Sequence, residues 1–412
     1  MKKKISRKHL LGCGCVAVAF AVLLCIRGYR ENRKQEIEVA LWAFDVYDDY
    51  MKQVQSLVPD IKIKWVAGQR DISYYKNLAE DGHLPDIITV RKFSLKDSLS
   101  LNPYLLDLTK TEVASSYYDI YLEHYKTSGG NVFWIPMSGT VDGIVANKTL
   151  FETYGIPVPR DFDSFVSACK EFEAHGIRGY SLDFSLDYNA LHFLQGMGIE
   201  NLASVDGIVW RKAYENGNTN QLDPKVWLPA FEKMERLNKL KILDKDTMYL
   251  DDMLSYQKFM EGTQAMVNIS SESISRLLPG QNIEILPYFG EQQDFLLTYP
   301  TFNAAISKNV EKSSEKKQAA WKVLTAMTSP QAQEVLNQYT DGLISYKRDV
   351  SFQYEGSMSM VQQYLETNRT CFRLGSEDFF EISKQTLDEM LEHNLSAESA
   401  LDLMNGYLSH SE

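Results

Sequence analysis

The stretch that decides the fold of this chain is Trp134-Ile135-Pro136-Met137-Ser138-Gly139-Thr140-Val141-Asp142-Gly143-Ile144-Val145-Ala146-Asn147-Lys148-Thr149-Leu150-Phe151. A strand-like run leads into a turn at Pro136, a Ser-Gly-Thr loop and a second β-branched run, and a helix opens near Asn147. The stretch contains no histidine, no cysteine and no pair of acids. We therefore expect it to cross between two lobes as a hinge, with Gly139 and Gly143 supplying backbone freedom, rather than to react with a substrate.

Length and composition indicate a globular protein of two domains. A chain of 412 residues is too long for one compact core and suits two domains of roughly 150–200 residues each. Hydrophobic residues make up 44% and charged residues 24%, as in ordinary folded domains. Residues 1–34 carry a net charge of +8, so the whole-chain charge of −12 leaves −20 for residues 35–412. Such an acidic body repels nucleic acid, and we expect no nucleic-acid partner.

The basic N-terminal segment, residues 1–34, is typical of membrane targeting. Five basic residues precede an uncharged run from Leu10 to Ile26, which reaches the lower limit of about 17–25 residues for a spanning helix. Three readings stay open: an uncleaved anchor, lipidation at Cys25, or cleavage and secretion. The first two tether the body to the outer face of the cytoplasmic membrane, because the leading lysines keep the N-terminus inside.

An alternation of strand and helix patterns follows. Apolar residues predict strands over 37–41, 61–66 and 87–90, and helices between them over 47–57 and 74–81. This βαβαβ order implies a mostly parallel sheet with helices on both faces. Ligands of such sheets bind beyond the carboxyl ends of the strands. Asp45 is a candidate cap for the first helix or a ligand contact. From residue 347 onward the chain reads as mostly helical.

A set of motifs in a fixed order resembles the family 1 extracellular solute-binding proteins of ABC importers. The hinge stretch resembles the first crossing of that family, with Ala146 where the family usually has Tyr. The other matching segments are Leu105–Thr109, Tyr154–Pro159, Phe259–Met266, Ala319–Leu324, Thr328–Gln333 and Tyr339–Ile344. Two further departures are Ser345 in place of a Pro and Glu272 in place of a stacking Trp. Each motif is weak alone, and together they span roughly residues 36–346.

The resemblance implies an α/β fold with two hinged lobes, the type II periplasmic-binding-protein architecture. Lobe 1 would comprise residues 35–140 and 300–340, and lobe 2 would comprise residues 141–299 and 341–412. About three crossings would join them. It also implies capture of a small solute, a mono- or oligosaccharide, and delivery to ABC permease subunits by a monomer without cofactor or metal.

Sugar binders combine aromatic faces with hydroxyl-pairing groups, and a cleft supplies these from both sides. By position at strand ends, at the hinge or near a helix start, the candidate ligand-binding residues are Trp42, Phe44, Asp45, Arg91, Ser138, Asp142, Tyr188, Asn189, His192, Glu272 and Phe302. For the aromatic candidates the competing reading is core packing. For the polar candidates the competing readings are helix caps, hinge contacts and ion pairs.

Signatures of catalysis are absent from the sequence. The chain has no Gly-x-Ser-x-Gly elbow, no phosphate-binding loop with Lys-Ser/Thr and no His-Glu-x-x-His, and its Cys/His spacing suggests no zinc site. Cys169 and Cys371 are the cysteines outside the N-terminal segment, and we expect Cys169 to be a buried free thiol. We expect no catalytic residues. Two alternative functions stay open: a sensory binding protein that signals to a receptor kinase, and an anchored extracellular glycoside hydrolase.

Overall fold

The computed structural model describes residues 34–91, 93–182, 187–244, 252–339, 342–350 and 356–410. The membrane-targeting segment expected over residues 1–34 lies outside these residues except for Lys34. Among the helices that the structure describes, none is long and apolar enough to cross a membrane.

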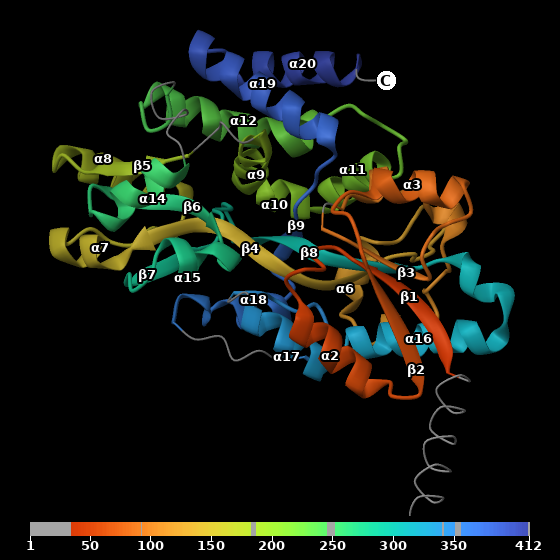
Figure 1. Ribbon diagram of the computed structural model, residues 1–412. Helices are drawn as coiled ribbons and strands as arrows, with labels where there is room; N and C mark the ends of the chain where they lie inside the picture. The colour runs from red at the N-terminus through yellow and green to blue at the C-terminus, as the bar shows by residue number, and fades with distance from the viewer. Residues whose placement is uncertain are drawn as a thin grey trace, which may run out of the picture.

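One mixed sheet of nine strands runs through the described part of the chain (Figure 1). The strands are β1 (Gln35–Leu41), β2 (Ile61–Ala67), β3 (Ile87–Val90), β4 (Ile135–Asn147), β5 (Arg178–Ser181), β6 (Gln264–Ser270), β7 (Ile283–Leu286), β8 (Leu296–Ile306) and β9 (Thr370–Phe372). Their order is β2-β1-β3-β8-β4-β6-β5, with β7 on β4 and β9 on β8. We call the side of β1–β3 the first lobe and the side of β5–β7 the second lobe. Both lobes share β4 and β8.

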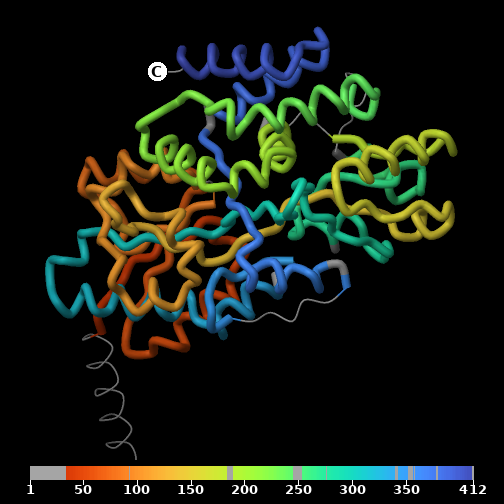
Figure 2. The backbone as a smooth tube through the Cα atoms, turned by 180° about the vertical axis from the view of Figure 1, so that it is seen from behind, coloured from red at the N-terminus to blue at the C-terminus, as the bar shows by residue number. Residues whose placement is uncertain are grey.

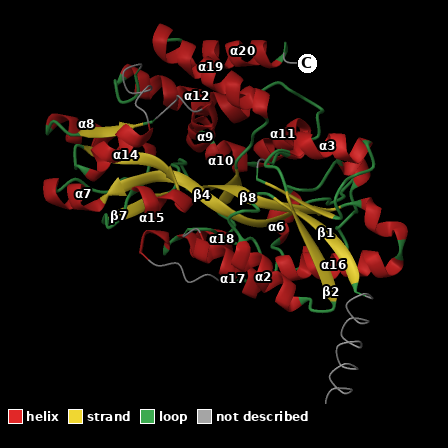
Figure 3. Ribbon diagram, viewed as in Figure 1, coloured by secondary structure: helices red, strands yellow, loops and turns green. Residues whose placement is uncertain are grey.

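Helices cover both faces of the sheet (Figure 3). Those of the first lobe are α2 (Asp48–Leu57), α3 (Ile72–Glu80), α4 (Leu95–Ser98), α5 (Glu112–Ser115), α6 (Asp119–Glu123), α16 (Ser314–Met327), α17 (Pro330–Tyr339) and α18 (Val361–Glu366). Those of the second lobe are α7 (Lys148–Tyr154), α8 (Phe162–Ala174), α9 (Asp187–Met197), α10 (Ile199–Ala203), α11 (Val205–Glu215), α12 (Pro224–Lys239), α14 (Asp252–Met260), α15 (Ile274–Leu277), α19 (Glu377–His393) and α20 (Ala397–Leu408). Short 3₁₀ turns are η1 (Asn102–Tyr104), η2 (Ser271–Ser273), η3 (Lys308–Lys312) and η4 (Gly356–Met358).

The predicted βαβαβ unit is present in the first lobe. β1 pairs in parallel with β2 and with β3, and the alternating apolar residues of β1 point into the core, since Ile37, Val39 and Leu41 are buried. Asp45 was a candidate N-cap of α2, and the structure contradicts that role. Tyr47 is the N-cap residue of α2, and Asp45 lies two residues before it on an exposed turn.

The hinge stretch differs from its prediction, because β4 is one continuous strand of 13 buried residues rather than two runs separated by a loop. The pairing with β8 continues through the predicted loop, with register shifts on either side of Ser138. Gly139 is needed here for close approach. A Cβ at this position would lie 2.0 Å from the hydroxyl oxygen of Tyr346, and the Gly139 backbone pairs in both directions with Ile344. Asn147 caps α7 through its side chain, so the helix begins where it was expected.

Two clusters of buried apolar side chains form the cores. Figure 2 shows from behind the backbone of the segments that carry them. The first packs α2, α16 and α17 against β1–β3 and reaches β4 and β6. The second packs α8, α9, α12, α19 and α20 around β5 and β7. Ile344, Tyr346 and Val361 belong to the first cluster, although the sequence suggested that everything after residue 340 joins the second lobe. The reason is the bridge from Ile344 to Gly139, which holds this segment under the hinge before the chain crosses at β9.

Candidate ligand-binding cleft

The carboxyl ends of strands from the two lobes point at each other across the middle of β4. On the first-lobe side, the end of β3 connects through Asn303 of β8 to Pro136 of β4. On the second-lobe side, β6 runs against β4 and ends where Ser270 pairs with Asp142. Residues 137–141 of β4 lie between the two ends. Because ligands bind beyond the carboxyl ends of strands in α/β sheets, the space over this part of β4 is the candidate cleft.

An ion pair joins the two strand ends. Arg91 follows β3, Glu272 follows β6, and Arg91 Nη2 donates a hydrogen bond to Glu272 Oε1. The side chains keep 30% and 20% of their surface exposed, respectively, so the pair is only partly screened by water. The Arg91 guanidinium also lies 5.4 Å from the centre of the Trp42 ring, a cation–π contact at the end of β1.

A second charged cluster lies deeper in the cleft, around Arg373. Its Nη1 is 2.6 Å from Asp142 Oδ2 and 3.0 Å from His192 Nδ1, and its Cζ is 3.7 Å from the centre of the Tyr299 ring. Burial and the adjacent Arg373 hold the pKa of His192 well below its ordinary value, so the imidazole is neutral. Its Nδ1 then accepts from Arg373, and the proton is on Nε2. The Tyr299 hydroxyl donates to Arg91 O at 2.9 Å, which connects the two clusters.

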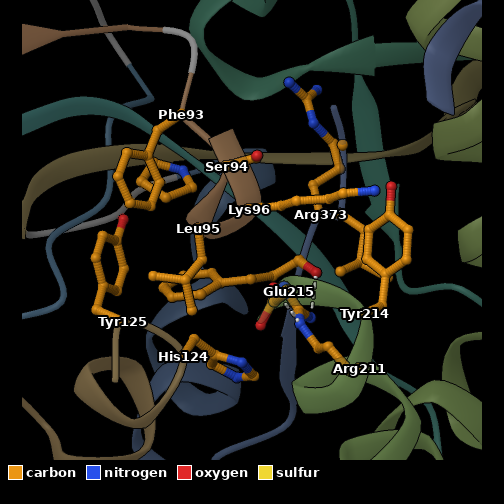
Figure 4. A pocket seen from close by; sticks show the side chains of 14 residues that line it. Phe93, Ser94, Leu95, Lys96, His124, Tyr125, Arg211, Tyr214, Glu215 and Arg373 are labelled. Atoms are coloured by element: carbon orange, nitrogen blue, oxygen red, sulfur yellow. Dashed lines mark hydrogen bonds and ion pairs between the residues drawn. The ribbon is translucent and has the colours of Figure 1, made fainter. Parts of the chain in front are cut away.

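A pocket opens beside Arg373, and its walls come from both lobes (Figure 4). Its cavity volume is about 30 Å³ in this arrangement, and the pocket is partly open to solvent. Lys96 of α4 and His124 at the end of α6 face Arg211, Tyr214 and Glu215 of α11. Glu215 accepts from Arg211 Nε at 2.9 Å. The Lys96 ammonium lies 4.9 Å from the centre of the Tyr214 ring, so one contact spans the cleft.

Further contacts between the lobes lie near this pocket. Lys212 of α11 forms an ion pair with Glu123 of α6, and the Asn216 side chain accepts from Ser128 N at 2.7 Å. With Arg91–Glu272 on the other side, the lobes touch on both flanks of the cleft. The structure therefore represents a closed arrangement.

Five of the residues predicted from the sequence lie around this cleft. They are Trp42, Arg91, Asp142, His192 and Glu272. Trp42, Arg91 and Glu272 follow strands, Asp142 lies within β4 opposite the end of β6, and His192 lies in the first turns of α9. The structure thus brings these predicted residues into two ion pairs beside the candidate cleft, although the sequence did not indicate which partners they would have.

Two other predicted aromatic residues, Phe44 and Phe302, pack into or against the first core. Phe302 is 1% exposed, and its ring lies between Trp42 and Tyr50 at centroid distances of 5.5 and 6.1 Å. Phe44 is half-buried against the same cluster. Asp45 is exposed on the turn that follows Phe44.

Three polar or hinge candidates are distributed around the floor and the second lobe. Ser138 is 1% exposed in β4, and its hydroxyl has no hydrogen-bond partner among the described residues. Asn189 is 9% exposed in the first turn of α9. Tyr188 belongs to the same turn, and its side chain is not among those that the structure describes.

Sequence reasoning missed five side chains of the cleft: Lys96, Arg211, Glu215, Tyr299 and Arg373. Tyr299 lies in β8, three residues before the candidate Phe302, and was not among the ligand candidates. Arg373 follows β9, a strand of three residues in a region that reads as helical, so no local pattern marked it. The α11 residues are spaced as in any amphipathic helix, and only the closure of the lobes gives them a role.

Neither a metal site nor a disulfide appears within the described ranges. No group of three or more His, Cys, Asp or Glu side chains there has the geometry to hold a metal ion. Cys169 and Cys371 are both free and buried, as expected for Cys169. Burial raises the pKa of both thiols.

Comparison with known proteins gives a consistent family. A multiple sugar-binding protein of Streptococcus mutans is 24% identical over 192 residues, which cover 42% of this chain and 41% of that protein. The match thus spans less than half of that relative. Among solved structures, a family 1 extracellular solute-binding protein from Bifidobacterium longum subsp. infantis superposes with a TM-score of 0.77 at 17% identity, covering 91% of this chain and 99% of that one. The solute-binding protein RafE in complex with raffinose gives 0.62 at 18%, covering 90% and 98%.

These likenesses show the two-lobed α/β fold. The decisive finding is a family model described as bacterial extracellular solute-binding protein, which matches residues 44–334. That range contains β4, β8 and both sides of the cleft. The chain belongs to the bacterial extracellular solute-binding proteins.

Proposed function

We propose that this protein captures a small carbohydrate between its lobes outside the cytoplasm and delivers it to an ABC importer. The observation that carries the proposal is the pair of opposed strand ends over residues 137–141, where aromatic and hydroxyl-pairing side chains of both lobes meet. Sugars present C–H patches and hydroxyl groups, and this mixture matches both. Raffinose in the similar RafE structure and the sugar-binding relative support the same ligand class.

The mechanism is a hinge clamp. Ligand binds to one lobe of an open form, and contacts from the other lobe stabilise closure. The hinge comprises β4, β8 and the chain around β9, and the register shifts at Ser138 are where β4 bends most easily. Shifting such a clamp from 1:99 to 99:1 closed requires about 5.5 kcal/mol of differential affinity.

Binding rather than catalysis fits the carboxylates of the cleft. Asp142, Glu215 and Glu272 each form an ion pair with an arginine. A glycosidase needs one carboxyl group free to give a proton and another free to attack or activate water. Incubation with oligosaccharides tests this part: the binder returns its ligand intact, and release of new reducing ends would reject it.

The composition of the N-terminal segment suggests how the protein is attached to the membrane. We infer that residues 1–34, which are basic and apolar, tether a monomeric body to the outer face of the cytoplasmic membrane. The tether would be an uncleaved helix or a lipid on Cys25. The closed form would then meet permease subunits in the same membrane. Co-purification with those subunits in the presence of ligand, and loss of the complex without it, are the expected results.

Thermal shift with a panel of mono- and oligosaccharides tests the central proposal. A ligand that binds only the native state raises the melting temperature, by an amount that grows with its concentration. We expect at least one sugar to do so, and isothermal titration calorimetry to confirm one site per chain. If no sugar produces a shift while an amino acid, peptide or polyamine does, the carbohydrate assignment is wrong.

A further inference from the structure

The basic side chains of the cleft differ in whether an acidic side chain lies beside them. Each of its three arginines lies against a carboxylate: Arg91 with Glu272, Arg211 with Glu215, and Arg373 with Asp142. Lys96 also lines the pocket, yet no carboxylate within the described residues lies in ion-pair distance of its ammonium. Of the charged side chains that line the pocket itself, three are cationic and one, Glu215, is anionic.

Lys96 is placed to reach a ligand. It belongs to the short helix α4 on the first-lobe wall, and its half-buried side chain extends across the pocket toward Tyr214 of the second lobe (Figure 4). The ring face of a tyrosine attracts a cation, but more weakly than a carboxylate does. An anionic group of a ligand can therefore replace the Tyr214 ring as the partner of the Lys96 ammonium.

The setting makes this charge unusual for the chain. Residues 35–412 carry a net charge of −20, and several lysines of the exposed surface pair with acids. Examples are Lys62 with Glu36, Lys64 with Glu38 and Lys212 with Glu123. A lysine that keeps its charge uncompensated inside the cleft of an acidic protein is more useful for recognition than for stability.

The other titratable groups of the pocket do not oppose an anion strongly. Glu215 is held by Arg211, and burial raises its pKa, which further weakens its negative charge. His124 is neutral, because burial and then Arg211 hold its pKa well below the ordinary value. The phenols Tyr125 and Tyr214 are neutral donors and acceptors.

We propose that the ligand is an anionic sugar whose carboxylate or phosphate group pairs with Lys96. The inference rests on the proposed function and adds the ligand class to it. A sugar acid or sugar phosphate would place its ring against the aromatic residues of the pocket and its charge at the ammonium. The pairing would form as α4 and α11 approach, so the anion would also favour closure.

Matched sets of probes test the proposal on the full chain. The first set consists of galactose, galacturonic acid and galactose 6-phosphate, and the second consists of glucose, glucuronic acid and glucose 6-phosphate. The third set pairs galactotriose with trigalacturonic acid. Calorimetry should give the anionic member of at least one set an affinity about tenfold or more above its neutral parent. The preference should shrink with added NaCl, because salt screens partly exposed charge pairs. Carboxylate and phosphate members distinguish the two sources of the charge.

Two variants make the result specific. Lys96→Gln should lower the affinity for the anionic sugar about tenfold more than it lowers the affinity for the neutral parent, so that the anionic preference is lost. Lys212→Gln, which removes a cation paired with Glu123 outside the pocket, should leave the preference intact. Circular dichroism and the melting temperature show whether the variants fold.

Each outcome bears on one claim. Neutral sugars that bind as well as or better than anionic ones would overturn this inference and leave the proposed function standing. An anionic preference that survives in Lys96→Gln would overturn the assignment to Lys96. Failure of every neutral and anionic sugar to bind would instead reject the proposed function.

Discussion

Breaking the Arg91–Glu272 pair should open the cleft. The substitution Glu272→Gln keeps the size and a hydrogen-bonding oxygen but removes the charge. Because the two side chains are 30% and 20% exposed, the pair is intermediate between exposed pairs, worth about 0.2–1 kcal/mol, and buried pairs, whose disruption costs about 3–5 kcal/mol. We expect the closed form to lose about 1–2 kcal/mol, which reduces the closed-to-open ratio about 5- to 30-fold.

The distance between the lobes reports this change directly. Spin or fluorescent labels on α3 and on α12, one in each lobe, should show a larger ligand-free separation in Glu272→Gln, and the ligand dissociation constant should rise by a similar factor. Glu36→Gln is the matched control, because its partner Lys62 lies in the same lobe. The charge swap of Arg91→Glu with Glu272→Arg should restore part of the closure. Unchanged separation and affinity in Glu272→Gln would refute the reasoning.

Other substitutions and conditions give further expectations. Gly139→Ala should lower the free energy of unfolding by about 1–3 kcal/mol in urea titrations, since its Cβ would lie 2.0 Å from the Tyr346 hydroxyl, whereas Gly406→Ala, with open space around it in α20, should be neutral or slightly stabilising. Equal stability of the two variants would contradict this account of the hinge. Trp42→Ala should fold yet lose the ligand-induced rise in melting temperature, and a retained rise would mean that the cleft is elsewhere. The lowered pKa of His192 means that the unfolded chain takes up a proton near pH 6.5 that the folded chain does not, so stability should fall as the pH drops below about 6.5, by about 1.4 kcal/mol per pH unit for this group. His192→Gln should have a shallower decline between pH 6.5 and 5 in the same titrations, and an unaltered slope would show that the imidazole is protonated in the fold.

The helices and strands that open the first lobe, and the protein family, could be predicted from the sequence alone. Local patterns placed β1, α2, β2, α3 and β3 almost at their observed bounds. The first four have apolar residues at strand or helix spacing, and β3 is a short buried run that follows a Pro-Asp turn. The continuous β4 was not predictable from Pro136 and the Ser-Gly-Thr run, because its pairing partners on β8 lie 155 to 169 residues later in the chain. Tertiary pairing overrode a local turn signal there.

The cleft was harder to predict than the fold. Trp42, Arg91 and Glu272 could be proposed because the ends of strands are identifiable in a sequence, and the structure brings the three into contact beside the candidate cleft. Arg373 and Lys96 follow or belong to elements of three and four residues, too short for any periodicity to register. Their importance arises from the approach of α4 and β9 to α11, a long-range arrangement that local residue patterns do not encode.

The sharing of β4 and β8 between lobes has a consequence for biosynthesis. β3 completes its hydrogen bonding only when residues 303–306 of β8 lie beside it, and β4 pairs with residues 297–304. A chain that leaves the ribosome N-terminus first therefore cannot finish either half until about three quarters of it has been made. Such non-local pairing slows folding. The nascent polypeptide thus lacks a complete sheet for most of its synthesis, and either half acquires its final shape only after β8 has been made.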